Sequence, residues 1–234
     1  MIKPLLITSL CAFLASAGFF SLAVASGVAH GGRDFWQNVG LHSGDPIGGE
    51  GPQTTRTIPW PGGDTLEVSV GADVRYVQGP NAGLTVTGRK TTVDNLEVSN
   101  GELRFIKSMN HRGDLDIVLT APDVKKFKLR GSHSLVVDNY DQDTIDVSLA
   151  GSGDVDINGK ARRLDLSIAG SGDVDAADLV LAEAKVSIAG SGDATVGPTQ
   201  LAEISIAGSG DVDLTSHPAT MNSKVAGSGS ITQN

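Results

Sequence analysis

The sequence predicts an all-β fold, a single-stranded parallel β-helix with about 19 residues per coil and irregular N-terminal coils. Three observations support this prediction. A Gly-Ser-Gly corner recurs every 18 to 20 residues in the second half of the chain, apolar and polar residues alternate around each corner, and no repeat shows helical spacing. Glycine is also abundant, at 30 of 234 residues, as expected where many tight turns are needed.

The repeated corner defines the coils. The leading glycines of the corners are Gly131, Gly151, Gly170, Gly190, Gly208 and Gly227. Between corners, Leu164, Leu166 and Ile168 alternate with polar or small residues. A unit of this length cannot bury its own apolar face, so the units must stack at the ~4.8 Å spacing of neighbouring strands. Two inward columns follow, Val155, Val174, Ala194, Val212 and Ile231 in one, and Leu149, Ile168, Ile188, Ile206 and Val225 in the other.

Two other architectures fit less well. A β-propeller needs ~40 residues or more for each blade. An antiparallel meander would not repeat the same corner. Because connections between parallel strands strongly favour one hand, we expect right-handed coiling.

Residues 56–128 indicate the same architecture with decayed repeats, and the regular β-helix is expected over 129–234. Short alternating runs occur at 66–70, 84–86, 96–98, 103–105 and 115–119. The bulky residues that the regular coils lack are Tyr76, Phe105 and Phe127. We therefore expect an irregular, broader first half with room for about three turns.

Residues 1–25 have the features of a secretory signal peptide. Lys3 provides a short positive start, an apolar stretch follows, and Ala23-Val24-Ala25 forms a small-x-small cleavage pattern. The alternative is an uncleaved N-terminal anchor, since the uncharged stretch is long enough to span a bilayer. Both a cleaved signal peptide and an uncleaved anchor predict that the bulk of the protein lies outside the cytoplasm, in the periplasm, on the outer surface or in the medium.

Residues 26–55 are dense in glycine and proline without periodicity, which predicts a flexible linker. The aromatic residues Phe35, Trp36 and Trp60 are exceptions in this region, and we expect them to dock on the folded domain. The single cysteine, Cys11, excludes a disulfide framework within the chain. A formal net charge of −9 argues against nucleic acid as a partner.

The serial Gly-Ser-Gly-Asp corners, each preceded by a Ser-Ile-Ala type sequence, resemble the head GIN domain family, which is labelled as auto-transporter adhesins. The order of the segments is also similar: a signal peptide, irregular strands, Ala-Pro-Asp-Val at 121–124, and then the corners. The resemblance covers roughly 56–234. It implies a β-helical bacterial protein that is secreted or held in the envelope, and it supplies no catalytic residues.

Seven aspartates are expected to share one outward face. They are Asp154, Asp156, Asp173, Asp175, Asp193, Asp211 and Asp213. Aspartate beside glycine favours turns, because its carboxylate bonds nearby backbone. The alternative role is calcium binding, but calcium takes 6–8 oxygen ligands and one flat face offers too few. We therefore expect solvated or turn-forming side chains and no metal site.

Few residues of the sequence support a catalytic function. Lys160, Arg162 and Arg163 form the one basic cluster of the regular half, and an acidic face would repel a polyanionic substrate.

No histidine has a partner at metal-ligand spacing, and His133 is expected to be a variant of the corner. The histidines are His30, His42, His111, His133 and His217. The outward serines lack a histidine partner or a nucleophile elbow, and they are Ser148, Ser167, Ser187 and Ser205.

The sequence therefore predicts a non-enzymatic secreted or cell-envelope β-helix that acts as a surface, adhesion or scaffold module. The alternative is a β-helix that binds or cleaves polysaccharide, with or without calcium. The expected partner is an envelope protein or a glycan, and no cofactor is expected. The last corner is followed by only three residues after Ile231, without capping charge or proline, which predicts weak self-association through the C-terminal coil.

Overall fold

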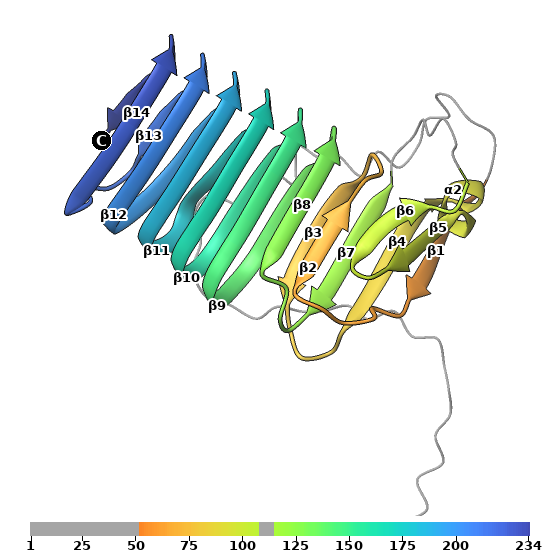
Figure 1. The fold of residues 1–234 in the computed structure, drawn as a ribbon. Coiled ribbons are helices and arrows are strands. Elements are labelled where there is room, and N and C mark those ends of the chain that lie inside the picture. Colours follow the sequence, from red (N-terminus) through yellow and green to blue (C-terminus); the bar gives the residue numbers. More distant parts are fainter. Residues whose placement is uncertain (1–51, 108–114) are drawn as a thin grey trace, which may run out of the picture. The chain divides into compact units, whose positions relative to one another are not determined.

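The computed structural model describes residues 52–107 and 115–234. It confirms the predicted all-β fold, a mostly parallel β-solenoid of about 5 turns, with roughly 20 residues per turn and irregular N-terminal strands (Figure 1). The predicted signal peptide and the linker up to residue 51 lie outside the described residues, while residues 53–55 belong to the first strand. Right-handed coiling stays a prediction.

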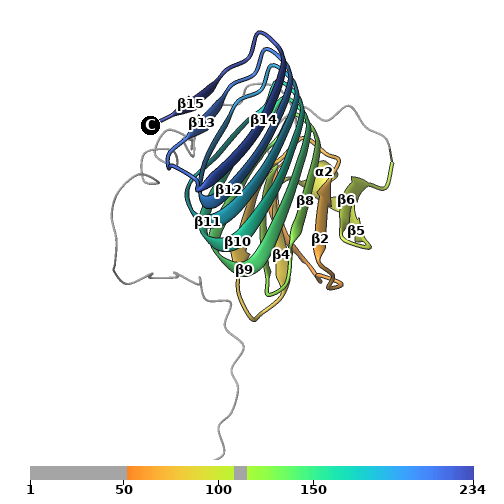
Figure 2. The same cartoon turned by 60° about the vertical axis from the view of Figure 1, so that its left-hand side comes forward.

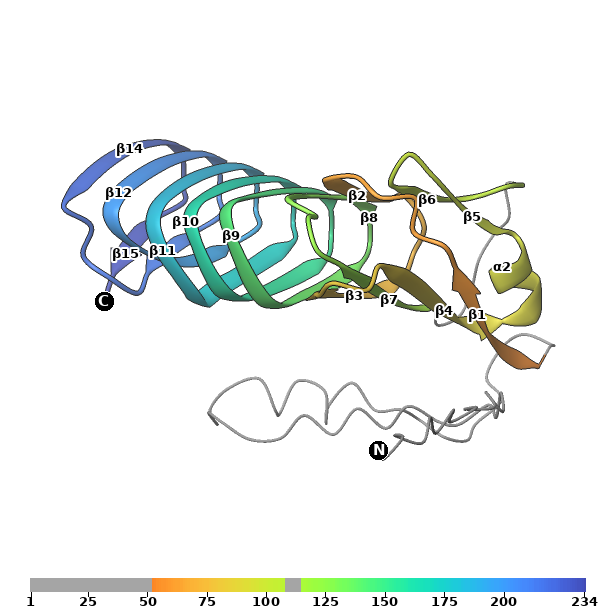
Figure 3. The same cartoon turned by 90° about the horizontal axis from the view of Figure 1, so that it is seen from below.

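Four long strands form the regular coils, and each runs from just after one corner, around the return, to the next corner. They are β9 (Ser134–Gly151), β10 (Asp154–Gly170), β11 (Asp173–Gly190) and β12 (Ala194–Gly208). Neighbouring coils pair in parallel, so that the same position of each repeat is stacked (Figure 3). The next coil is divided into β13 (Val212–Leu214) and β14 (Thr220–Gly227), which both pair with β12, and β15 (Ile231–Gln233) pairs with β13 as the start of a further coil.

The predicted inward columns are confirmed. Ile188 pairs with Ile168 on one side and Ile206 on the other, and all three side chains are buried. Val155, Val174, Ala194 and Val212 are likewise stacked and buried, with Ile231 partly buried at the end. Burial of these columns provides the main stabilisation of the stack.

The two glycines of a corner have different roles. Gly190 adopts φ +140°, where a side chain would be strained. Gly192 has no positive φ, but a Cβ on it would lie 2.2 Å from the carbonyl oxygen of Gly172 in the preceding coil. The first glycine of the corner is therefore required by its backbone conformation, and the second by the close approach of the coils.

The N-terminal half contains eight strands and one short helix among the described residues. They are β1 (Gln53–Ile58), β2 (Thr65–Val68), β3 (Asp73–Gln78), β4 (Gly83–Arg89), α2 (Lys90–Asp94), β5 (Leu96–Ser99), β6 (Glu102–Phe105), β7 (Asp116–Ala121) and β8 (Lys126–Gly131). The predicted alternating runs all fall in or beside these strands, and their apolar positions line the core. Figure 2 shows this half beside the regular coils.

Two features of this half differ from a simple series of decayed coils. Strand β3 lies between β7 and β9, and β2 lies between β6 and β8, so the stacking does not follow chain order. In addition, β4 is antiparallel to β7 and β1, and β5 is antiparallel to β6. These antiparallel strands add to the stack on the side away from the regular coils.

Aromatic side chains fill the interior where the two halves meet. Tyr76 and Phe127 have ring centroids 5.1 Å apart, and Phe127 and Tyr140 lie 6.5 Å apart, both edge to face. The Tyr76 hydroxyl donates to the carbonyl oxygen of Ala121 at 2.7 Å, and burial raises the pKa of this phenol to about 12. Trp60 is buried as predicted, whereas Phe35 and Trp36 lie outside the described residues.

Replacement of Ile188 by Asp should unfold the domain or cost several kcal/mol, because it buries an unpaired charge between two coils. The matched control is Ala189→Asp, which places the same side chain on the exposed outer surface of the same strand. Thermal denaturation followed by circular dichroism measures both. Equal shifts for the two variants would contradict the assignment of the faces.

The last coil exposes part of its interior. Strand β14 pairs with β12 through one edge, all eight of its residues are exposed, and Met221 and Val225 are 44% and 41% exposed although they continue inward columns. The predicted self-association of this chain would cover them. We expect concentration-dependent sedimentation, weakened in Thr232→Lys. A monomer at every concentration would rule the association out.

Candidate functional site

The seven predicted outward aspartates lie on one outer face of the solenoid. Six of them are exposed, and Asp156 is half-buried. The pairing of the coils places them in two rows that run along the stack. The sequence therefore predicted correctly both the face and the alignment of these side chains.

The first row is longer than predicted, because Asp73 of β3 and Asp116 of β7 extend it. In spatial order the row is Asp116, Asp73, Ser134, Asp154, Asp173, Asp193, Asp211 and Ser230. A signal for Asp73 was present, since Gly71-Ala72-Asp73-Val74 has the Gly-Asp-Val order of the regular corners with one alanine inserted.

Carboxylates of this row bind the backbone of the next coil. The amide of Asp193 donates to Asp173 Oδ1 at 3.0 Å, the amide of Asp211 donates to Asp193 Oδ1 at 2.7 Å, and the amide of Ser230 donates to Asp211 Oδ1 at 2.7 Å. These bonds join one coil to the next, whereas the sequence suggested bonds within one corner. The three carboxylates therefore help to hold the stack together.

Asp154 differs from the three aspartates that follow it in the row. The amide of Asp173 donates to the carbonyl oxygen of Gly153 at 3.0 Å and does not bind the Asp154 carboxylate. In the described part of the chain, no donor contacts the Asp154 side chain. Its carboxylate is thus exposed and available to solvent or to a ligand.

In the second row, Asp156 stands beside Asp175 on the neighbouring coil. Burial, and then the carboxylates of Asp175, Asp138 and Asp178, raises the pKa of Asp156 above its ordinary value of 3.8. One of these carboxylates, Asp138, is paired with Arg75 at 2.6 Å. Burial and like-charge repulsion therefore both favour the protonated form of Asp156.

The calcium alternative receives no support from the described residues. Among residues 52–107 and 115–234, no three side chains of histidine, cysteine, aspartate or glutamate are grouped so that they could hold a metal ion. A row of aspartates along one flat sheet presents its oxygens side by side, whereas calcium needs them around a centre.

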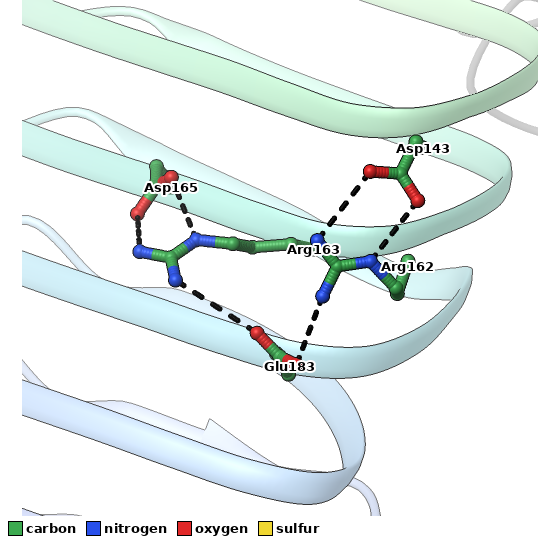
Figure 4. Close-up of polar contacts among 5 residues, drawn as sticks. All are labelled: Asp143, Arg162, Arg163, Asp165 and Glu183. Carbon is green, nitrogen blue, oxygen red and sulfur yellow. Dashed lines mark hydrogen bonds and ion pairs between the residues drawn. The ribbon is translucent and has the colours of Figure 1, made fainter.

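The predicted basic cluster is engaged in ion pairs: Figure 4 shows those of Arg162 and Arg163, and Lys160 pairs with Asp141 at 3.0 Å. Arg162 contacts Asp143 at 3.0 Å on one neighbouring coil and Glu183 at 2.9 Å on the other. Arg163 contacts Asp165 at 2.8 Å and reaches Glu183 at 3.8 Å. The two arginines therefore link three successive coils through their return segments, and this structural role accounts for the cluster.

The histidines and serines are placed as follows. His133 is a buried member of the first corner, with Nε2 in contact with the carbonyl oxygen of Arg130. His217 is exposed, and His30, His42 and His111 lie outside the described residues. The four outward serines form one row on the strand segments that precede the corners, and no histidine lies in that row.

A groove lies at the junction of the irregular and regular halves, and we call it the junction groove. It has a volume of about 560 Å³ and is lined by residues 71–73, 132–134 and 152–154, with Leu115 and Ser171. It therefore includes the part of the first row that contains Asp73, Ser134 and Asp154. No sequence pattern indicates this groove, because it depends on the pairing of β3 with β9.

Comparison with known proteins identifies the family of the chain. Residues 64–218 match the family model described as "Putative auto-transporter adhesin, head GIN domain". No curated protein matches the chain.

Solved structures share the fold. A crystal structure of a "putative adhesin" from Bacteroides fragilis is 20% identical with a TM-score of 0.66, over 78% of this chain and 97% of that one. A crystal structure of a "Putative lipid binding protein" from Parabacteroides distasonis is 24% identical with a TM-score of 0.50, over 80% and 98% of the two chains. At these identities the similarity extends to the fold alone.

Replacement of Asp193 by Ala should lower the free energy of unfolding by about 1 kcal/mol, because the amide of Asp211 loses its acceptor. Asp193→Asn keeps an oxygen at this position and should have little effect. Chemical denaturation of the two variants checks this. Equal destabilisation by Asn and Ala would show that charge, and not the acceptor, is what matters.

Replacement of Asp156 by Asn should stabilise the protein at pH 7 by roughly 1–3 °C in Tm, and not at pH 3. The raised pKa means that the folded state holds the proton more tightly than the unfolded chain, so stability falls as the pH rises above 3.8. The Asn variant does not incur this loss. Asp213→Asn, at an exposed position in the same row, is the control and should change Tm little. A gain of the same size at pH 3 would contradict the titration argument.

Proposed function

Because the chain belongs to the head GIN domain family of auto-transporter adhesins, we propose that it is a non-enzymatic adhesion or scaffold module, exported to the cell envelope or the medium. The proposal also covers the division of the chain: a signal peptide or anchor at 1–25, a flexible linker from residue 26 that ends before β1 begins at Gln53, an irregular half up to residue 128 and regular repeats at 129–234.

The observation that carries the proposal is the uniformity of the outer faces. Ala169, Ala189 and Ala207 are stacked and exposed, and Ser167, Ser187 and Ser205 form a parallel row beside them. These two rows of small side chains form a flat strip, along which a partner can approach the sheet closely over several coils. The next outward row carries the longer side chains of Asp165, Lys185 and Glu203. Specific interfaces bury about 1,600 Å² in total, so a partner of this face would have to contact several coils at once.

The charges support a binding role over catalysis. Polysaccharide cleavage requires a basic side chain near carboxylates in one groove. Of the basic residues of the regular half, Arg162 and Arg163 are held by the ion pairs described above, and Lys160 by Asp141 at 3.0 Å. Lys185 and Lys224 line a groove in which Glu203 is the single carboxylate, so a pair of carboxylates with a base is not assembled there. The junction groove, whose lining includes no lysine or arginine, offers no such partner for its carboxylates.

Export is supported by the sequence of residues 1–25 and by the family. The described residues include no helix that could cross a membrane, and the one helix among them has five residues.

The proposal is tested by expressing the chain with a C-terminal epitope tag in a bacterial host and comparing cell fractions. We expect the tagged protein in the envelope or the medium, and we expect purified protein on beads to retain envelope fragments. A matched variant, Ser187→Lys with Ser205→Lys, places two charges on the flat face and should reduce retention. Cytoplasmic accumulation would overturn export. Retention that is absent, or unaffected by the double variant, would overturn the role of this face.

A further inference from the structure

The junction groove exists because the corners diverge where the irregular half meets the regular half. Between regular coils the corners are in contact, and a Cβ on Gly153 would lie 2.2 Å from the carbonyl oxygen of His133. On the other side of this corner the spacing opens, since a Cβ on Gly71 would find its nearest atom, the carbonyl oxygen of Ser132, at 4.0 Å. A side chain is therefore tolerated at His133, where the later corners require glycine.

The groove contains polar groups that the fold does not use. The Asp154 carboxylate has no donor in the described part of the chain, in contrast to Asp173, Asp193 and Asp211, which each bind an amide. Asp73 accepts a hydrogen bond from Ser134 Oγ at 2.5 Å through one oxygen, Oδ1. The hydroxyls of Ser132, Ser152 and Ser171 stand at successive corners, so strand spacing places them ~4.8 Å apart along the groove.

An independent observation comes from His133, which also lines the groove. The residue is only 6% exposed, and its Nε2 contacts the carbonyl oxygen of Arg130. The other ring nitrogen, Nδ1, is buried without a hydrogen-bond partner among the described residues. A buried polar atom of this kind is costly unless a group from outside the chain satisfies it, either a water molecule or a ligand.

The lining determines the class of ligand. It contains two carboxylates, several hydroxyls and one imidazole, while no lysine or arginine is among its residues. The first row of aspartates extends this negative charge along the stack, and the whole chain carries a formal net charge of −9. The potential therefore attracts cations and repels polyanions, and the hydroxyls favour a ligand that is itself rich in hydrogen-bonding groups.

We propose that the junction groove binds an oligosaccharide with free amino groups, with the Asp154 carboxylate accepting hydrogen bonds from a ligand ammonium group. The corner hydroxyls of Ser132 and Ser152 bind hydroxyls of the sugar. This site is separate from the flat serine and alanine face, so adhesion through that face does not depend on it.

The test is calorimetric titration of the full chain with a β-1,4-linked glucosamine tetrasaccharide. We expect saturable binding that weakens about tenfold in Asp154→Asn, the loss of one charge-assisted contact. The matched control is Asp193→Asn, which removes a charge from the same row but outside the groove and should leave the affinity unchanged. Circular dichroism confirms that both variants are folded.

Two further probes separate the ligand classes. The fully N-acetylated tetrasaccharide, which lacks the ammonium groups, should bind at least tenfold more weakly. A tetralysine peptide should bind without dependence on Asp154, as diffuse attraction to the acidic face. The proposal is overturned if the glucosamine tetrasaccharide does not bind at millimolar concentration, if the two Asn variants lose affinity equally, or if the peptide shows the same Asp154 dependence as the sugar. Occupation of the groove by water alone would produce the first of these results.

Discussion

Backbone hydrogen bonding between coils in strict register is the constraint on which the rest of the structure depends. At each corner the chain passes so close to the previous coil that the amide of Ser209 donates to the carbonyl oxygen of Gly190 at 2.8 Å, and a Cβ on Gly208 would lie 1.9 Å from that oxygen. The corner must therefore repeat the same residues, and every other position is then stacked on its counterpart. The buried columns, the outward rows and the flat serine and alanine face are all consequences of this register.

The regular half could be predicted because its nearly constant repeat length determines which residues of neighbouring coils pair with each other. Counting residues between corners was sufficient to place Ile188 between Ile168 and Ile206 and to assign the faces. The irregular half has alternation without a repeated corner. Alternation shows that Leu66 and Val74 belong to strands with a buried face, but it does not identify the neighbouring strands. The insertion of β3 between β7 and β9 joins segments about 40 to 60 residues apart, and no local pattern reports such a pairing.

The candidate site was likewise predictable only in part. The repeat length was sufficient to place the aspartates in rows, but whether a carboxylate accepts a hydrogen bond depends on which backbone amide of the next coil is free. The amide of Asp173 binds the carbonyl oxygen of Gly153, whereas the amide of Asp193 binds the carboxylate of Asp173. This change in hydrogen bonding occurs between two coils whose corner sequences are identical. Sequence alone therefore cannot separate the structural aspartates from Asp154, and the junction groove was missed because its walls come from both halves.

Charge is distributed unevenly around the coil, and this bears on how such a surface binds. On the return segments, arginines neutralise the acids of adjacent coils, as Arg162 does for Asp143 and Glu183. Beside the corners, the aspartates are not matched by basic residues within their row. The solenoid therefore presents the same kind of acidic side chain on successive coils, at a fixed spacing. Each contact is weak in water, where neighbouring charges interact by about 1 kcal/mol. A partner that spans several coils engages them together, so that its binding strength comes from the number of repeats.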